Sequence, residues 1–289
     1  MSQNTNTNTK TPNPSNPSSL KPRYEIRTLE PKHAQWAIAI IIHSNLFHSP
    51  VWPVLYPENI NARVFDGLDH AEYLVMHQID SGHSFGVFDT EYQFKREESK
   101  ASGGKLYWDR NEKSVQEEKG LEAEGQRLLE QMDFPLVSVA MSYDGADPLD
   151  LEKMGPLLGV LPHFGPLYHV LEVLDPREKD SWAPKTRGEV LMRNATATRH
   201  DYEGEKIMAG LARFLMREAD ARGFRGVQIE CVHDAVTHVW SNPPAPYKGS
   251  IVSEFHTGTY KDEEGKLFFA PAQQRITKCY VELKPKASE

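Results

Sequence analysis

The chain has 289 residues, 39% of them hydrophobic and 26% charged, which suits a globular protein of one large domain or two small ones. Its net charge of -8 provides no basic excess to bind a phosphate backbone, so a nucleic acid is not an expected partner. The N-terminus lacks an apolar signal segment, and the longest apolar run, about residues 37–42, is too short to span a membrane. We expect one cytoplasmic domain without membrane insertion, with the nucleus as the alternative location.

Residues 1–22 consist mostly of Asn, Thr, Ser, Pro and Lys, which bury too little surface to offset the entropy of ordering a backbone. We predict a disordered tail here and a domain over 23–289. Tyr24–Leu29 alternates like a strand, and Pro31–His48 has the apolar period of a helix, with Pro31 suited to its first turn. A loop at Trp52–Ile60 and a short helix at Ala71–Asp80 should follow.

The middle of the chain is less regular. Strand-like segments occur at His83–Thr90, Gly104–Asp109 and Phe134–Ser142. A solvated hairpin-type connection joins the first two. The polar stretch Asn111–Met132 predicts an exposed helix or a mobile insertion. Asp147–Leu174 is rich in Leu, Pro and Gly, so we expect short helices, broken at its prolines and glycines, that form a wall or lid.

The C-terminal part shows a clear order of elements. The pattern predicts a strand, an amphipathic helix ended by Gly223, a buried strand, a short helix and two closing strands. The corresponding ranges are Gly188–Thr198, Gly204–Arg222, Val227–Val232, Asp234–Trp240, Ser250–Tyr260 and Arg275–Leu283. Cys231 and Cys279 lie in two of these strands, where reduced core thiols are expected unless the strands are neighbours that allow pairing.

A loop that leaves a strand and enters a helix presents unpaired backbone N–H groups at a positive dipole end, which favours phosphate. Gly204 would let a phosphate approach the main chain, and Lys206 could add a charge contact. Many such loops contain a glycine and bind nothing. The candidate binding residues are Thr198, Arg199, Asp201, Tyr202, Gly204 and Lys206.

The order of strand, glycine-containing loop, helix ending in ADARGF, apolar strand, short helix and two strands resembles the GNAT N-acetyltransferase superfamily. The resemblance is best over Gly188–Leu283, and Tyr24–Trp36 suits the family's opening strand and helix. It implies an α/β GNAT-like fold, a mixed central sheet flanked by helices, with an insertion between the third and fourth strands at about 95–187. It also implies acyl-CoA-dependent N-acyltransfer to a small-molecule or protein amine, with acetyl-CoA as cofactor bound through its pyrophosphate at the loop.

Two family motifs are only partly present. The loop pattern, Gln or Arg, two residues, Gly, one residue, then Gly or Ala, falls on Asp201, Gly204 and Lys206, so the middle glycine alone agrees. The tyrosine that protonates the departing thiolate in the family corresponds to Trp240, whose indole N–H cannot serve as that acid. Ser241 and Tyr247 are the nearest other donors.

The family reaction also needs a group that accepts the proton of the amine. Glu189 and Glu230, on successive predicted strands, have the right chemistry, although the commoner role for each is that of a strand-edge or outward-facing residue. The departures at Asp201, Lys206 and Trp240 support an alternative, a catalytically degenerate GNAT-like binding or interaction module.

Other constellations carry less information. His163, His169 and Glu172 match no metal-ligand spacing, so no metal is expected, and the His233–Asp234 pair lacks a nucleophile elbow. Aromatic residues in irregular segments either line an apolar pocket or plug the end of the sheet; these are Trp52, Tyr56, Phe164 and Tyr168.

Overall fold

The computed structural model describes residues 20–284, so most of the predicted tail lies outside the described residues. Leu20 and Lys21, which the sequence assigns to that tail, instead contact the domain. The Leu20 side chain is buried in a hydrophobic core, and Lys21 Nζ lies 2.7 Å from a carboxylate oxygen of Glu205. Burial of the apolar Leu20 side chain stabilises this contact with the domain.

Seven strands form one mixed sheet in the order β1-β2-β5-β6-β7-β9-β8. Only the β6–β7 pair is parallel, and the other five pairs are antiparallel. The strands are β1 (Tyr24–Thr28), β2 (Phe85–Asp89), β5 (Leu136–Asp144), β6 (Val190–Thr198), β7 (Gly226–Cys231), β8 (Lys248–His256) and β9 (Arg275–Glu282), and the short pair β3 (Lys105–Leu106) and β4 (Met132–Asp133) lies apart.

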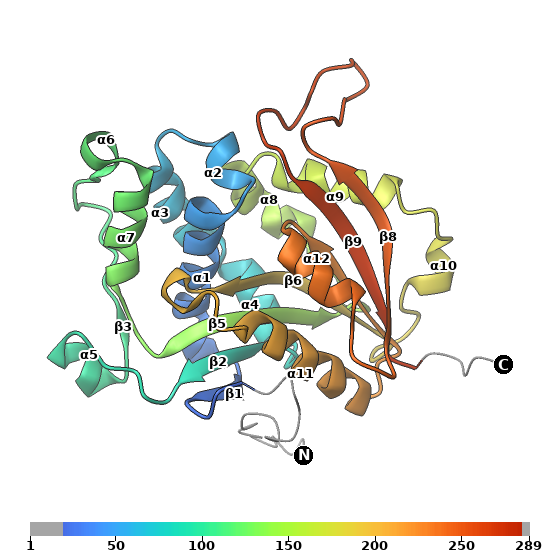
Figure 1. Ribbon diagram of the computed structural model, residues 1–289, viewed down its shortest axis with the longest axis horizontal. Coiled ribbons are helices and arrows are strands. Elements are labelled where there is room, and N and C mark those ends of the chain that lie inside the picture. Colours follow the sequence, from blue (N-terminus) through green and yellow to red (C-terminus); the bar gives the residue numbers. More distant parts are fainter. Residues whose placement is uncertain (1–19, 285–289) are drawn as a thin grey trace.

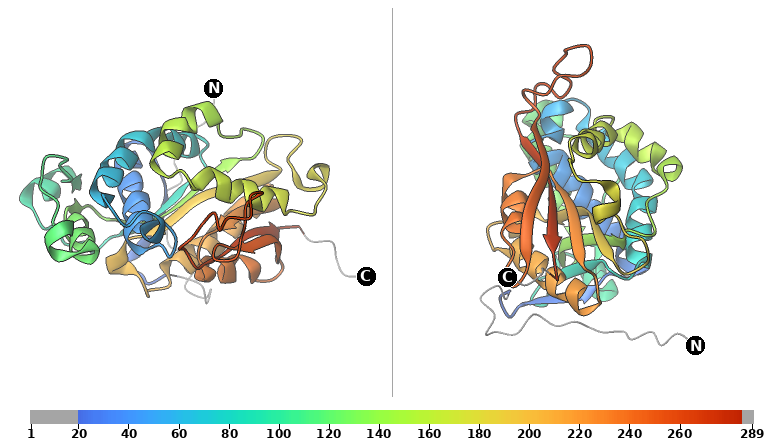
Figure 2. Two further views of the ribbon diagram at one scale, coloured as in Figure 1. Left: turned by 90° about the horizontal axis from the view of Figure 1, so that it is seen from above. Right: turned by 90° about the vertical axis from the view of Figure 1, so that its right-hand side faces the viewer.

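Helices cover both faces of the sheet (Figures 1 and 2). One face packs α11 (Ile207–Ala221) and α12 (Asp234–Ser241) into one core, and the other face packs α1, α4, α8 and α9 into a larger core. The remaining bounds are α1 (Ala34–His43), α2 (Trp52–Leu55), α3 (Ile60–His70), α4 (Glu72–Asp80), α5 (Glu97–Ser102), α6 (Gln116–Lys119), α7 (Leu121–Glu130), α8 (Leu151–Val160), α9 (Phe164–Val173) and α10 (Lys179–Trp182), with single turns η1 (Pro31–His33), η2 (Ser44–His48) and η3 (His200–Tyr202).

Most predicted elements are present, and the differences have local causes. Pro156 lies inside α8 without breaking it, because the helix packs its Met154, Leu157 and Val160 side chains into the core. The segments expected as a loop at 52–60 and a hairpin connection at 95–103 each contain a short helix, α2 and α5. Within residues 20–284, no helix combines the length and apolar composition needed to cross a bilayer.

The predicted insertion at about 95–187 is not one continuous addition. It contains β5, a fully buried central strand, whose side chains are covered on both faces of the sheet. Helices α8, α9 and α10 lie after it, between the third and fourth strands of the main sheet. Figure 1 shows α8 and α9 above the central strands β5 and β6. Leu157 of α8 and Phe164 and Tyr168 of α9 line the cavity described below, so this segment forms one of its walls.

Candidate active site

The parallel strands β6 and β7 separate in the middle of the sheet. Their pairing runs from Val190 opposite Gly226 to Arg193 opposite Ile229 and ends there. Beyond that point β6 pairs only with β5, as far as Thr198, and β7 pairs only with β9, as far as Cys231. Within the described part of the chain, the inner edges of both strands are therefore left without a strand partner, and their backbone groups are free to bond a ligand.

A β-bulge in β6 marks the start of this split. The pairing with β5 shifts between Ala140 and Ser142, and Ala195 adopts a left-handed conformation with φ of 74°. Arg193, which is 2% exposed, donates hydrogen bonds to the Met141 carbonyl and to hydroxyls on β5 and β6. An alanine in this conformation is strained, and the buried arginine holds the bulge in place.

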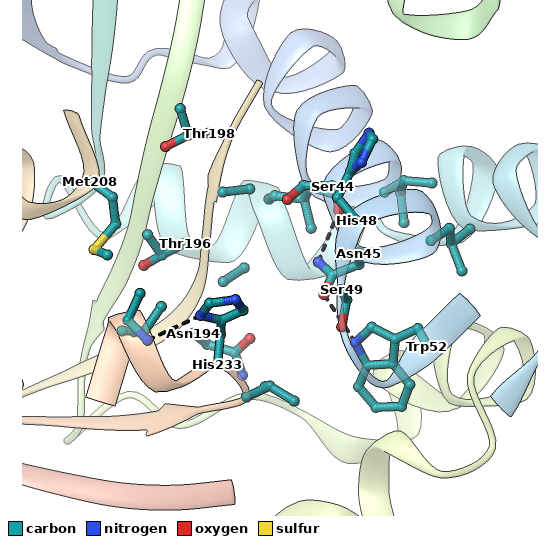
Figure 3. A pocket seen from close by; sticks show the side chains of 18 of the residues that line it. Ser44, Asn45, His48, Ser49, Trp52, Asn194, Thr196, Thr198, Met208 and His233 are labelled. Atoms are coloured by element: carbon teal, nitrogen blue, oxygen red, sulfur yellow. Dashed lines mark hydrogen bonds between the residues drawn. The ribbon is translucent and has the colours of Figure 1, made fainter. Parts of the chain in front are cut away.

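A cavity of about 510 Å³ occupies the split and is lined from both faces of the sheet. This volume lies in the range of small-molecule and cofactor sites. Figure 3 shows side chains of β6, α11 and the N-cap of α12 on one side, and side chains of η2, the following Ser49 and α2 on the other. These are Asn194, Thr196, Thr198, Met208 and His233, facing Ser44, Asn45, His48, Ser49 and Trp52.

The predicted loop, Arg199–Lys206, opens onto this cavity. Tyr202, Gly204 and Lys206 line it, together with Thr198 from the end of β6. Gly204 has φ of 78°, and a β-carbon placed on it would meet nothing within 4 Å, so its main chain borders open space. Lys206 precedes α11 with φ of 62°, and its side chain is exposed.

Arg199 and Asp201, the other two loop candidates, do not line the cavity. The buried Arg199 guanidinium donates two hydrogen bonds to the Asp201 carboxylate, at 3.1 and 2.7 Å, and one to the Phe134 carbonyl at 2.9 Å. The Tyr202 hydroxyl donates to Asp89 at 2.8 Å. These contacts support the loop from beneath, so the carboxylate of Asp201 is neutralised by Arg199 and does not repel an anion in the cavity.

The first turn of α11 has the features of an anion site. Among residues 20–284 no side chain caps this helix, and Gly210 makes its first backbone bond, to the Lys206 carbonyl at 3.0 Å. Met208 and Ala209 of this turn line the cavity. The fifteen-residue length of α11 and its uncapped N–H groups give a positive helix end, which fits a diphosphate.

Glu230, one of the two predicted proton acceptors, lies in the cavity wall near the end of β7. Burial raises the pKa of this carboxyl to about 7, and Lys278, opposite it on β9, partly counteracts the effect. Lys278 Nζ lies 3.1 Å from Asp175, a carboxylate that Arg177 also contacts. Glu230 is therefore a carboxyl that changes protonation near neutral pH, as a general base requires.

The remaining predicted residues lie elsewhere. Glu189, just before β6, accepts hydrogen bonds from the Lys185 N–H and the Thr186 hydroxyl, at the end of β6 away from the split. The Tyr247 hydroxyl donates to Asp220 at 3.2 Å, outside the cavity lining. Trp240 is fully buried in the core between α12 and the sheet. The structure thus brings Glu230 together with the loop, but neither Glu189 nor Tyr247.

Sequence reasoning missed the η2 segment, a turn of π-helix that continues α1 and contributes Ser44, Asn45 and His48 to the cavity. Such turns often occur at functional sites. The His48 ring stacks on His200 of the loop, with ring centres 3.8 Å apart, and burial lowers its pKa to about 4. The uninterrupted helical pattern of residues 31–48 contains no signal for the extra residue per turn.

Comparison with known proteins supports the architecture. No family model matches the chain, and no curated protein sequence matches it. The C-terminal condensation domain of Ebony, solved in complex with beta-alanyl-dopamine, has a TM-score of 0.56 and 17% identity, covering 91% of this chain and 99% of that one.

Two enzyme structures resemble this chain to a similar degree. Arylalkylamine N-acetyltransferase 2 from Aedes aegypti has a TM-score of 0.54 and 11% identity, covering 90% of this chain and 99% of that chain. An agmatine N-acetyltransferase in its apo form has a TM-score of 0.51 and 11% identity, with the same coverage of 90% and 99%. The split sheet, the glycine loop before α11 and these shared folds confirm the predicted resemblance: the chain has the fold of the GNAT N-acetyltransferases.

Proposed function

We propose that this protein transfers an acyl group from acyl-CoA, with acetyl-CoA as the expected donor, to a primary amine. The observation that carries the proposal is that the uncapped N-terminus of α11 and the split between β6 and β7 border the same cavity. The first feature suits a diphosphate and the second suits an extended chain that ends in a thioester.

The cofactor would lie along β6. Main-chain N–H groups at Gly204 and in the first turn of α11 would bind its diphosphate, with Lys206 adding a positive charge. The unpaired edge of β6 after Arg193 would hydrogen-bond the pantetheine arm in the manner of an added strand. Arg199, Asp201 and Tyr202 act as positioning residues, because their contacts hold the loop and leave the backbone N–H groups oriented before the ligand arrives.

Glu230 is proposed as the general base. The amine nitrogen attacks the thioester carbonyl carbon, Glu230 receives the proton that the nitrogen loses, and the carbon–sulfur bond breaks to release the thiolate. The products are an amide and, once the thiolate is protonated, free coenzyme A.

Tyr168 of α9 is the proposed donor of that last proton. Tyr168 and Tyr202 are the tyrosines of the described cavity lining, and the Tyr202 hydroxyl is already bonded to Asp89. Burial raises the pKa of Tyr168 well above its ordinary value. The hydroxyl therefore carries its proton at neutral pH but is a weaker acid, so the donation depends on the thiolate forming next to it. Ser241 and Tyr247, the donors considered from sequence, are not among the lining residues.

Thermal unfolding with and without coenzyme A tests the cofactor site. A ligand at a hundred times its Kd adds about 2.7 kcal/mol of stability, so a clear rise in melting temperature is expected at millimolar coenzyme A. Gly204→Glu should abolish the rise by placing a carboxylate at the diphosphate position.

Gly223→Glu is the matched control for that variant. Gly223 also has a positive φ and an open β-carbon position, but it follows α11 at its far end, away from the cavity. It should lose stability to the same backbone strain and keep the response to coenzyme A. If wild-type protein shows no response, the transferase proposal fails and the degenerate binding module remains.

A further inference from the structure

Part of the cavity lies on the face of the sheet covered by α1, α4, α8 and α9. We call it the acceptor chamber and define it by Leu74, Leu157, Leu161, Phe164, Tyr168 and Glu230. All but the last are apolar or aromatic. A ligand group that enters the chamber is therefore removed from water and gains by being apolar itself.

Among residues 20–284, Glu230 supplies the single carboxylate of the acceptor chamber. The Asp, Glu, Lys and Arg side chains of the described cavity lining are Glu203, Lys206 and Glu230, and the first two belong to the loop at the other end. His48 does not add a positive charge near pH 7, because burial lowers its pKa to about 4. The chamber can thus pair one amine with Glu230, and a second cationic group on the same ligand would be left unpaired.

Three aromatic rings of the cavity lining form a continuous strip: Phe164 and Tyr168 in the chamber, and Trp52 beside it. The ring centres of Trp52 and Phe164 lie 6.1 Å apart, and those of Phe164 and Tyr168 lie 4.7 Å apart. The Trp52 indole N–H donates to Asn45 at 3.0 Å, which fixes the orientation of that ring, as Figure 3 shows. Fixed rings at these separations provide faces and edges against which another aromatic ring can pack.

This inference rests on the transferase function proposed above: we propose that the acceptor is a monoamine that bears one aromatic ring system. The amine approaches Glu230, and the aromatic ring system packs on the Trp52–Phe164–Tyr168 strip. Diamines and guanidino-amines such as agmatine are disfavoured, because their second cation would lie against Leu157, Leu161 and Phe164 without a partner.

Steady-state acetylation of 2-phenylethylamine and agmatine, each with acetyl-CoA, tests the substrate class. We expect kcat/KM for 2-phenylethylamine to exceed that for agmatine by about 100-fold. Phe164→Ala should lower kcat/KM for 2-phenylethylamine by about tenfold or more and leave the value for n-butylamine less affected, because the lost contact is with the aromatic ring. His169→Ala is the matched control, since His169 lies on the same helix, is exposed and does not line the cavity.

Calorimetric binding of the same two amines, in the presence of coenzyme A, separates this inference from the transferase proposal. Preference for agmatine in either assay, or failure to bind or acetylate 2-phenylethylamine while coenzyme A stabilises the protein, overturns the substrate class and leaves the transferase standing. Tighter, Phe164-dependent binding of 2-phenylethylamine without acetylation of any amine supports the chamber assignment and overturns the transferase function.

Discussion

Replacing Glu230 with Gln should reduce activity and raise stability at the same time. Burial raises the pKa of this carboxyl from 4.5 to about 7 in the folded protein. Each unit of pKa difference between the folded and unfolded states corresponds to 1.36 kcal/mol. The ionised Glu230 therefore costs the native state about 2–3 kcal/mol, after allowance for its partial exposure.

The sign of the pH dependence follows from the raised pKa. The folded state binds this proton more tightly, so the stability from protonated Glu230 is complete below about pH 4.5 and is lost as the pH rises through about 7. Gln cannot ionise. The variant should be more stable than wild type by about 2 kcal/mol at pH 8 and nearly equal to it at pH 4.5.

Urea unfolding at pH 4.5 and pH 8 measures this difference, and initial rates with acetyl-CoA and 2-phenylethylamine measure the activity. Wild-type kcat/KM should fall about tenfold per pH unit below pH 7, and the Gln variant should lose about 10²- to 10⁴-fold and show no such limb. A Gln variant that is less stable at pH 8, or whose stability difference is the same at both pH values, would refute the assignment of a buried carboxyl with a raised pKa at this position.

Three further substitutions test the neighbours of the site. Lys278→Met removes the charge that lowers the Glu230 pKa, while Arg177 and the phenols of Tyr143 and Tyr168 remain nearby. The acid limb of the kcat/KM pH profile should therefore move to higher pH. The control Lys248→Met, at an exposed position of β8, should leave the limb unchanged. Tyr202→Phe deletes the hydrogen bond to Asp89 and should lower unfolding free energy in urea by about 1.5 kcal/mol and weaken coenzyme A binding measured calorimetrically; full retention of both contradicts its positioning role. Tyr168→Phe should lower kcat about 10²-fold in pre-steady-state assays, with amine binding kept, and an unchanged kcat excludes it as the proton donor.

The C-terminal half of the fold could be predicted from local pattern. Alternation in Gly188–Thr198, the apolar stripe of α11 and the glycine after it are each encoded within a few residues, and all three appear as expected. The loop before α11 is of the same kind, since Gly204 and the helix start define the open backbone by themselves. The secondary structure in the middle of the chain was harder to predict, because β5, α8 and α9 depend on the segments against which they pack.

Only the tertiary structure decides which of the candidate residues lie in the site. Glu189 and Glu230 both fall on strands predicted from the sequence. Glu189 lies just before β6, at the end where β6 and β7 are paired, whereas Glu230 lies in β7 where the two strands have separated. The pKa of Glu230 depends on burial by distant segments and on Lys278, which is 48 residues away along the chain. Amphipathic periodicity and turn chemistry act over one or two turns of chain, so the sequence alone determined the class of protein and the position of its loop. Burial, charge pairing and the split of the sheet arise only when segments far apart in sequence meet.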